Sequence, residues 1–213
     1  MTRDVQPRRQ KKIGIFSGTF DPVHAGHITF ALKALERSSL DQVIFIPESL
    51  PRRKDGVTHY AHRLAMLDLA LKPHKSLKVL ELPDKQFSVQ KTLPRLKKIF
   101  SNDELYILIG SDMVDMLLSP KAAAQWPDAQ NMLISMKLIV GVRGKKITEE
   151  YRQKIDMLRP GSIALASEKP AMSSSDIRSA LMRGKNSKDV LPSINKYIKA
   201  NWLYTSLAPV RSS

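Results

Sequence analysis

The sequence predicts an α/β fold in which a mostly parallel sheet is flanked by helices. Short apolar runs of strand length recur along the chain, and patterns of helical spacing lie between several of them. Parallel strands need crossover connections, so this alternation indicates a parallel sheet that is covered on both faces. We therefore expect a single Rossmann-like domain over residues 13–204.

Short apolar runs are the candidates for the strands. The clearest lie at residues 13–16, 43–46, 105–109 and 138–142, and weaker ones lie at 77–82 and 163–165. Pro47 stops the second run, and Gly110 stops the run at 105–109. Ligands of parallel sheets bind beyond the carboxyl ends of the strands, so we expect the loops that follow these strands to converge on one site.

Apolar residues at helical spacing predict helices after residue 27, over 60–71 and over 194–203. A further helical pattern spans residues 89–100, but Pro94 lies inside it. Proline is accepted in the first turn of a helix and kinks or breaks its interior. This helix therefore either begins near Pro94 or kinks there.

Composition restricts the class of protein. With 213 residues, of which 42% are hydrophobic, the chain can bury a full core in one domain. It has no cysteine, which excludes disulfides, thiolate metal sites and cysteine nucleophiles and favours a cytoplasmic location. No apolar run is long enough to cross a membrane, and residues 1–12 have no apolar stretch typical of a secretory signal. We expect residues 1–12 to form a flexible basic tail and residues 205–213 a C-terminal tail.

The formal net charge of +15 is typical of a protein that meets nucleic acid or handles phosphate. The basic residues are scattered along the chain, and only 6% of the residues are aromatic. The chain therefore lacks the basic residues interleaved with aromatic ones that are typical of proteins that bind single-stranded nucleic acid. We therefore interpret the charge as surface excess on a phosphate-handling enzyme and do not expect nucleic-acid binding as the main function.

The stretch G-T-F-D-P-V-H-A-G-H at residues 18–27 places His24 and His27 three positions apart, between a predicted buried strand and a helix. Gly18 allows a tight turn and a close approach of phosphate to the backbone. Unpaired amides and the positive end of the helix dipole favour an anion at the helix N-terminus, where His27 lies. This stretch therefore predicts a site for a nucleoside triphosphate.

A second stretch begins about 150 residues downstream, with Ser173, Ser174 and Ser175 followed by Ile177 and Arg178. The serines predict a capped helix start, and on their own they are typical of a surface helix. The guanidinium of Arg178 is a permanently charged, forked donor that matches the geometry of a pyrophosphate.

Residues 18–27 match every fixed position of G-x-F-D-P-x-H-x-G-H, the HxGH signature of the nucleotidylyltransferase superfamily, and residues 173–178 resemble its second signature. Further segments fall in family order, so that residues 13–204 resemble the bacterial nicotinate mononucleotide adenylyltransferases. The resemblance implies transfer of the adenylyl group of ATP to the phosphate of nicotinate mononucleotide. The products would be deamido-NAD and pyrophosphate, in NAD biosynthesis.

The resemblance also implies roles for individual residues. His24 and His27 would donate hydrogen bonds to the ATP phosphates, and Arg178 would hold the departing pyrophosphate. Magnesium would be bound with ATP, without a dedicated protein cage. The other implied ATP contacts are Gly18, Thr19, Phe20, Gly110, Asp112, Ser173, Ser174 and Ser175. The implied contacts with the pyridine mononucleotide are Arg53, Lys54, Phe87, Ser88 and Trp126.

Two departures from the family pattern concern the acceptor. Arg53 stands where the family usually has a histidine, and the pair Phe87-Ser88 replaces a Tyr-Thr pair. The alternatives are therefore a related transferase that uses nicotinamide mononucleotide, phosphopantetheine or a cytidine triphosphate donor, and a basic RNA- or DNA-binding protein on the same fold. Two of the residues also have purely structural interpretations, in which Asp112 is a helix N-cap and Trp126 is an aromatic residue of the core. A homo-oligomer is compatible with the sequence.

Overall fold

The computed structural model describes residues 9–51, 56–120, 128–142, 146–166 and 173–205. Within them a six-stranded sheet has the order β3-β2-β1-β4-β5-β6, and every neighbouring pair is parallel. The strands are β1 Lys12–Gly18, β2 Gln42–Pro47, β3 Leu77–Val79, β4 Glu104–Gly110, β5 Lys137–Val142 and β6 Ile163–Ala166. All the predicted strands are confirmed, although the weak run at 77–82 forms only a three-residue strand at the sheet edge.

The strand order reverses direction between β1 and β4. The chain builds outward from β1 through β2 to β3 and then returns to place β4 on the other side of β1. Such a reversal leaves a crevice at the carboxyl ends of the two central strands, because their connections leave on opposite faces of the sheet. The loops that follow β1 and β4 both open into this crevice.

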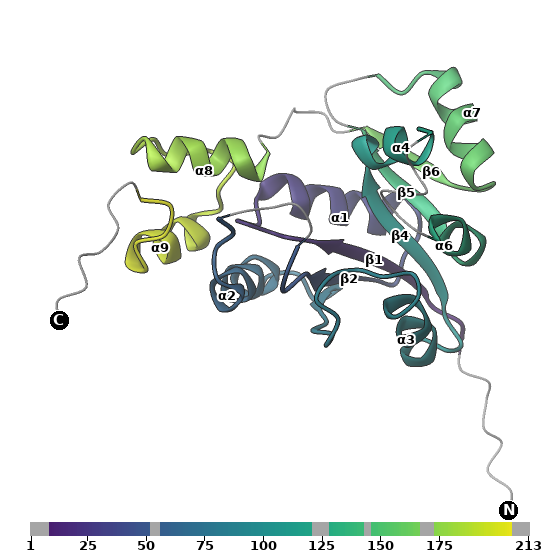
Figure 1. The fold of residues 1–213 in the computed structure, drawn as a ribbon, viewed down its shortest axis with the longest axis horizontal. Coiled ribbons are helices and arrows are strands. Elements are labelled where there is room, and N and C mark those ends of the chain that lie inside the picture. The colour runs from purple at the N-terminus through teal and green to yellow at the C-terminus, as the bar shows by residue number, and fades with distance from the viewer. Residues whose placement is uncertain (1–8, 52–55, 121–127, 143–145, 167–172, 206–213) are drawn as a thin grey trace, which may run out of the picture.

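Helices cover both faces of the sheet (Figure 1). The helices are α1 Ala25–Arg37, α2 Tyr60–Leu71, α3 Thr92–Ile99, α4 Ser111–Leu117, α6 Ala129–Ser135, α7 Glu149–Leu158, α8 Ser174–Met182 and α9 Pro192–Ala200. No described helix is long and apolar enough to cross a membrane. The prediction of an α/β domain with a parallel sheet flanked by helices is thus confirmed.

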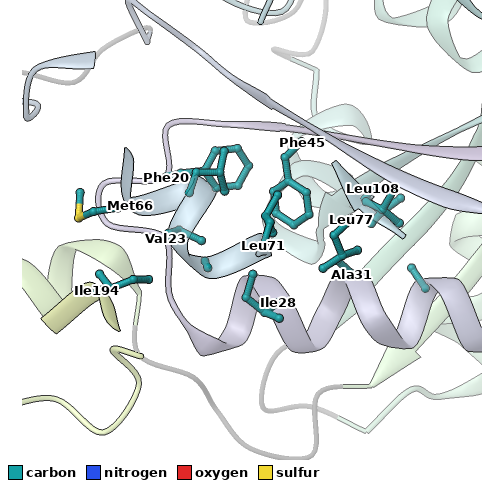
Figure 2. Close-up of a cluster of buried hydrophobic side chains, with 14 of the residues drawn as sticks. Phe20, Val23, Ile28, Ala31, Phe45, Met66, Leu71, Leu77, Leu108 and Ile194 are labelled. Carbon is teal, nitrogen blue, oxygen red and sulfur yellow. The ribbon is translucent and has the colours of Figure 1, made fainter. Parts of the chain in front are cut away.

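Alternate residues of the strands other than β3 supply two separate cores. Val43 and Phe45 of β2 join the cluster that α1, α2, α8 and α9 cover, whereas Ile44 and Ile46 join the cluster beneath α3, α4, α6 and α7. Figure 2 shows part of the first cluster, in which Phe45 and Phe20 lie above Ile28 of α1. Because both faces are buried, the central strands are continuously apolar instead of alternating.

The helix that contains Pro94 begins at Thr92, so Pro94 occupies the first turn. Proline costs no helical hydrogen bond there, which confirms the first of the two alternatives. Three of the described helices were not predicted. α4 and α6 have seven residues each, too few to establish a period, and α7 buries only Ile155.

Arg63 of α2 ties together the loops at the carboxyl end of the sheet. Its side chain is buried, with 1% exposure, and its guanidinium donates to the carbonyls of Thr58 (2.9 Å), Thr19 (2.6 Å) and Ser49 (3.1 Å). Burial lowers the pKa of Arg63, and the charge of nearby Asp21 opposes that shift. One planar fork thus fixes the loops after β1 and β2 and the residues that precede α2.

We expect Arg63→Lys to lower the free energy of unfolding by about 3 kcal/mol, because a single ammonium cannot reach all three carbonyls and unsatisfied buried acceptors are costly. Urea denaturation measures this change. The matched control is Arg95→Lys, in which the arginine is 45% exposed and paired with Asp84. That change should stay within about 0.5 kcal/mol. Equal losses of unfolding free energy in the two variants would contradict the role of Arg63 in fixing these loops.

Candidate functional site

A cavity of about 270 Å³ lies at the carboxyl ends of β1, β4 and β5. Its walls are residues 16–21 of β1 and the following loop, the first three turns of α1, the start of α4, the end of β6 and one face of α8. The two sequence motifs, which are about 150 residues apart in the chain, therefore meet at this cavity. This placement follows from the reversal of strand order between β1 and β4.

His24 and His27 close the N-terminus of α1 with their rings. His24 is the N-cap, and its Nδ1 accepts the backbone N–H of Gly26 at 3.1 Å. In return, Nδ1 of His27 accepts the backbone N–H of His24 at 3.2 Å. The two rings lie with their centroids 3.7 Å apart. This is the reciprocal pattern of a capping box, with imidazoles in the places usually taken by serine and glutamate.

The capping contacts determine which ring nitrogen carries the proton. A neutral imidazole has one donor and one acceptor nitrogen, so an Nδ1 that accepts a backbone N–H leaves the proton on Nε2. Both rings are therefore Nε2–H donors, and both His24 and His27 line the cavity. The helix cap and the donor array are the same pair of side chains.

Phe20 supports the ring of His27. Its ring packs edge-on to His27, with centroids 5.2 Å apart, and it also contacts Phe16 and Phe45. The backbone of Phe20 has φ +51°, an uncommon region for a large side chain, and the ring is 3% exposed. A Cβ at Gly18 would approach this ring to 3.2 Å. Gly18 and Phe20 both line the cavity, but most of the Phe20 side chain is core.

The second motif docks directly on the first. Arg178 of α8 donates from Nη1 to the carbonyl of Asp21 at 2.6 Å, and Ser174 donates from Oγ to the carbonyl of Pro22 at 3.1 Å. Both Arg178 and Ser174 line the cavity, as does Thr19. The guanidinium of Arg178 and the two imidazoles thus border one space.

The three serines at the start of α8 have different roles. Ser173 is the N-cap and forms a capping box with Asp176, whose pKa these hydrogen bonds lower. The Oγ atoms of Ser173 and Ser175 lie 2.8 Å apart. Ser173 therefore caps the helix, whereas Ser174 joins the helix to the first motif. Neither Ser173 nor Ser175 lines the cavity.

Gly110 and Asp112 form the part of the cavity contributed by β4 and α4. Gly110 is the N-cap of α4, so the interpretation of Asp112 as a plain N-cap is wrong. A Cβ at Gly110 would collide with the Asp112 carboxylate. Glycine therefore lets the carboxylate lie against the backbone at the cavity edge, whereas a Cβ at this position would make the Asp112 side chain turn away.

The residues expected to contact the acceptor are only partly described. Phe87 is 7% exposed and packs in the second core, and its backbone N–H donates to Glu48 Oε1 just beyond β2. Ser88 pairs with Thr92 at the start of α3. Neither Phe87 nor Ser88 lines the cavity. The other expected residues and tails, namely Arg53, Lys54, Trp126 and residues 1–8 and 206–213, lie outside the described residues.

Several residues of the site were not predicted. Asp21 was visible in the motif but had no assigned role, and Tyr204 was identified only as the last residue of the stretch that resembles the family. Lys33 of α1 lines the cavity and donates to the carbonyl of Ala166 at 3.3 Å, a contact that no sequence pattern indicated. Among the described residues no group of three or more histidine, aspartate or glutamate side chains is arranged to hold a metal ion.

Comparison with known proteins identifies the family to which this chain belongs. Residues 15–180 match the model of the cytidylyltransferase-like family, to which the chain belongs. Closer relatives narrow the class. A Carboxydothermus hydrogenoformans protein named probable nicotinate-nucleotide adenylyltransferase is 34% identical over 202 residues, which are 91% of this chain and 98% of the relative. The nicotinate-nucleotide adenylyltransferase of Bacillus subtilis is 33% identical and is covered completely, with 92% of this chain aligned. The chain is a member of the nicotinate-nucleotide adenylyltransferase family.

Solved structures agree on the fold. The structure of Plasmodium falciparum nicotinic acid mononucleotide adenylyltransferase complexed with NaAD is 21% identical and superposes with a TM-score of 0.75, covering 92% of this chain and 98% of that one. At this identity the likeness concerns the fold. It supports the six-stranded parallel arrangement described above.

We expect both His24 and His27 to be Nε2–H tautomers in solution at neutral pH, because each Nδ1 accepts a backbone N–H. Long-range ¹H–¹⁵N correlation spectra of labelled protein distinguish the tautomers by the nitrogen shifts. His74 lies three positions after the end of α2 and caps none of the described helices, so it serves as the internal reference. An Nδ1–H tautomer at either capping position would contradict the reciprocal cap.

Proposed function

We propose that this chain transfers the adenylyl group of ATP to the phosphate of nicotinate mononucleotide, forming deamido-NAD and pyrophosphate in NAD biosynthesis. The observation that carries the proposal is the cavity in which two Nε2–H imidazoles and the Arg178 guanidinium border one space. Such a donor set fits a polyphosphate. The names of the relatives and the NaAD complex of the structural neighbour support the choice of reaction.

The reaction needs little acid-base chemistry from the protein. An oxygen of the acceptor phosphate attacks the α-phosphorus of ATP and forms the new P–O bond. The bond from the α-phosphorus to the bridging oxygen breaks, and pyrophosphate leaves with the electron pair. The acceptor phosphate is already an anion near neutral pH, so no general base has to remove a proton. Rate enhancement then comes from positioning and from stabilising charge on the phosphates.

Each part of the cavity has a role in that step. His24 and His27 donate from Nε2 to the α- and β-phosphate oxygens, with the N-terminal amides of α1 beside them. Arg178 neutralises the leaving pyrophosphate. Asp112 accepts from hydroxyls of the sugar. The backbone at Gly18 and Thr19 lies close to the phosphates.

Magnesium enters with ATP in this scheme. The carboxylate of Asp21 is already engaged by protein donors, and the described residues hold no cluster that would form a cage for the ion. Mg²⁺ would therefore be held by phosphate oxygens and water, and it supplies charge neutralisation there. We place the reaction in the cytoplasm, in keeping with a chain that lacks cysteine.

The residues expected to choose the acceptor include both departures from the usual family pattern, Arg53 and the Phe87-Ser88 pair. Arg53 and Lys54 would supply positive charge for the carboxylate or phosphate of nicotinate mononucleotide, and Trp126 would stack on its pyridine ring. Phe87 and Ser88 would act through the backbone next to the end of β2. A carboxylate on the ring is the feature that separates the acid acceptor from the amide.

We expect pyrophosphate release with ATP and Mg²⁺ to be fastest when nicotinate mononucleotide is the acceptor, at least about tenfold faster in kcat/KM than with nicotinamide mononucleotide, because one charge-assisted contact is worth about that factor. A coupled pyrophosphate assay measures the rates, with phosphopantetheine as third acceptor and CTP as alternative donor. Release with phosphopantetheine alone, or with CTP alone, would overturn the assignment. Tight oligonucleotide binding at near-physiological salt, with no pyrophosphate from any acceptor, would favour the nucleic-acid alternative.

His24→Asn separates the capping role of the ring from its donor role. Asparagine is a good N-cap, so α1 stays capped, but the Nε2–H donor is lost. We expect turnover to fall by roughly 100- to 1,000-fold with the melting temperature almost unchanged. His24→Ala, the control, loses the cap as well and should lose about 1 kcal/mol of stability in addition. Turnover at the level of the unmodified protein in the asparagine variant would refute the donor role.

A further inference from the structure

Asp21 lies at the wall of the cavity, and its buried carboxylate is held by a residue from the far end of the chain. Asp21 is 1% exposed, and its Oδ1 accepts the hydroxyl proton of Tyr204 at 2.6 Å, across 183 positions of sequence. Its Oδ2 accepts the backbone N–H of Thr58 at 3.2 Å. Two neutral donors therefore make the short contacts of this buried charge.

Arg178 lies on the other side of Asp21 but is held mainly by the backbone. Nη1 of Arg178 donates to the Asp21 carbonyl at 2.6 Å, while its distance to Oδ2 is 3.7 Å, too long for a hydrogen bond. The Arg178 side chain is 26% exposed and lines the cavity. The guanidinium is thus anchored at one nitrogen beside a carboxylate with which it does not form a tight pair.

The hydroxyl of Tyr204 occupies Oδ1, one of the two Asp21 oxygens that a bidentate pair with a guanidinium needs, while Nη1 of Arg178 lies 3.7 Å from the other oxygen, Oδ2. Without this hydroxyl, Oδ1 of Asp21 would be a buried anion oxygen without its donor, which is costly. Arg63 is close enough to interact with Asp21, but its guanidinium is committed to three carbonyls. Arg178 is the partly exposed cation that can swing 1 Å or so to form a charge-assisted, bidentate pair.

We propose that the Tyr204 hydroxyl is a positioning group for Arg178: by holding Asp21 Oδ1, it prevents the guanidinium from closing on that carboxylate and leaves its donors to the polyphosphate in the cavity. The inference rests on the proposed function for the identity of the ligand. It makes the last described turn of the chain part of the nucleotide site, although Tyr204 is 8% exposed and does not line the cavity.

The surroundings keep the hydroxyl protonated. Burial raises the pKa of Tyr204 well above its usual value, and the neighbouring Asp21 charge raises it further. The hydroxyl therefore donates to Asp21 across the whole range in which the protein is assayed. Tyr204 packs in the same core as Ile194 and Ile198 of α9, so the ring is placed independently of its hydrogen bond.

The test is Tyr204→Phe, which keeps the ring in the core and removes only the hydroxyl. Isothermal titration calorimetry measures the affinity for inorganic pyrophosphate and for ATP with Mg²⁺, without an acceptor. We expect both dissociation constants to rise about tenfold. In steady-state assays the KM for ATP should rise while the KM for nicotinate mononucleotide stays constant. A merely structural role would lower the active fraction, and with it kcat, at unchanged KM.

Tyr197→Phe is the matched control. Tyr197 also lies near the C-terminus, on α9, and its hydroxyl bonds to Nδ1 of His62 on α2 at 2.9 Å. It does not line the cavity. Its loss should lower the melting temperature by a few degrees, as for Tyr204→Phe, and leave both affinities unchanged. Equal affinities in the two variants would overturn the positioning role. Failure of the unmodified protein to bind ATP or pyrophosphate would instead overturn the proposed function.

A double-mutant cycle tests whether Tyr204 acts on the ligand through Arg178. If Tyr204 acts through Arg178, Tyr204→Phe has no further effect on pyrophosphate affinity once Arg178→Ala is present. Additive losses would overturn the proposal. A crystal structure of the unmodified protein with pyrophosphate is informative even if Tyr204→Phe does not fold. In that structure we expect Arg178 to contact the ligand while its Nη1 still donates to the Asp21 carbonyl and the Tyr204 hydroxyl still donates to Oδ1. A guanidinium that no longer contacts Asp21 would overturn the proposal.

Discussion

A buried carboxylate holds the parts of this site together. Asp21 receives the Tyr204 hydroxyl, the backbone N–H before α2 and, through its own carbonyl, the Arg178 guanidinium. These donors come from three segments that share no sequence neighbourhood. A buried charge is stable only when its hydrogen bonds are satisfied, so each segment must be in place for the others to be favourable. The backbone carbonyl of Asp21, and not its carboxylate, holds Arg178 at the edge of the cavity.

The sheet determines where this carboxylate can lie. The loop after β1 leaves at the point where the strand order reverses, so it is open to α8 on one side and to the start of α4 on the other. Both faces of the sheet are covered by helices and cannot admit a ligand. The cavity is consequently confined to the strand ends, and α1 points the amides of its first turn toward it.

The sequence predicted the sheet well because each strand is a run of apolar residues that both cores require. It missed α4, α6 and α7, since seven residues or one buried side chain leave no readable period. The histidines and Arg178 were identifiable from local motifs. Tyr204 was not identifiable, because its partner is 183 residues away and nothing near it in the chain marks a hydrogen bond to a buried aspartate. Likewise, the capping role of the His24 ring depends on three-dimensional contacts that the motif spacing allows but does not specify.

The capping box also restricts the chemistry. Each imidazole uses Nδ1 to accept a backbone N–H and carries its proton on Nε2, so neither ring offers a free lone pair to a substrate. His24 and His27 can donate to anions but cannot act as general bases without uncapping α1. A nucleophile that must lose a proton, such as a sugar hydroxyl, would find no base in this pair. A phosphate monoester arrives already ionised, and it is therefore the class of acceptor that this pair of rings can serve.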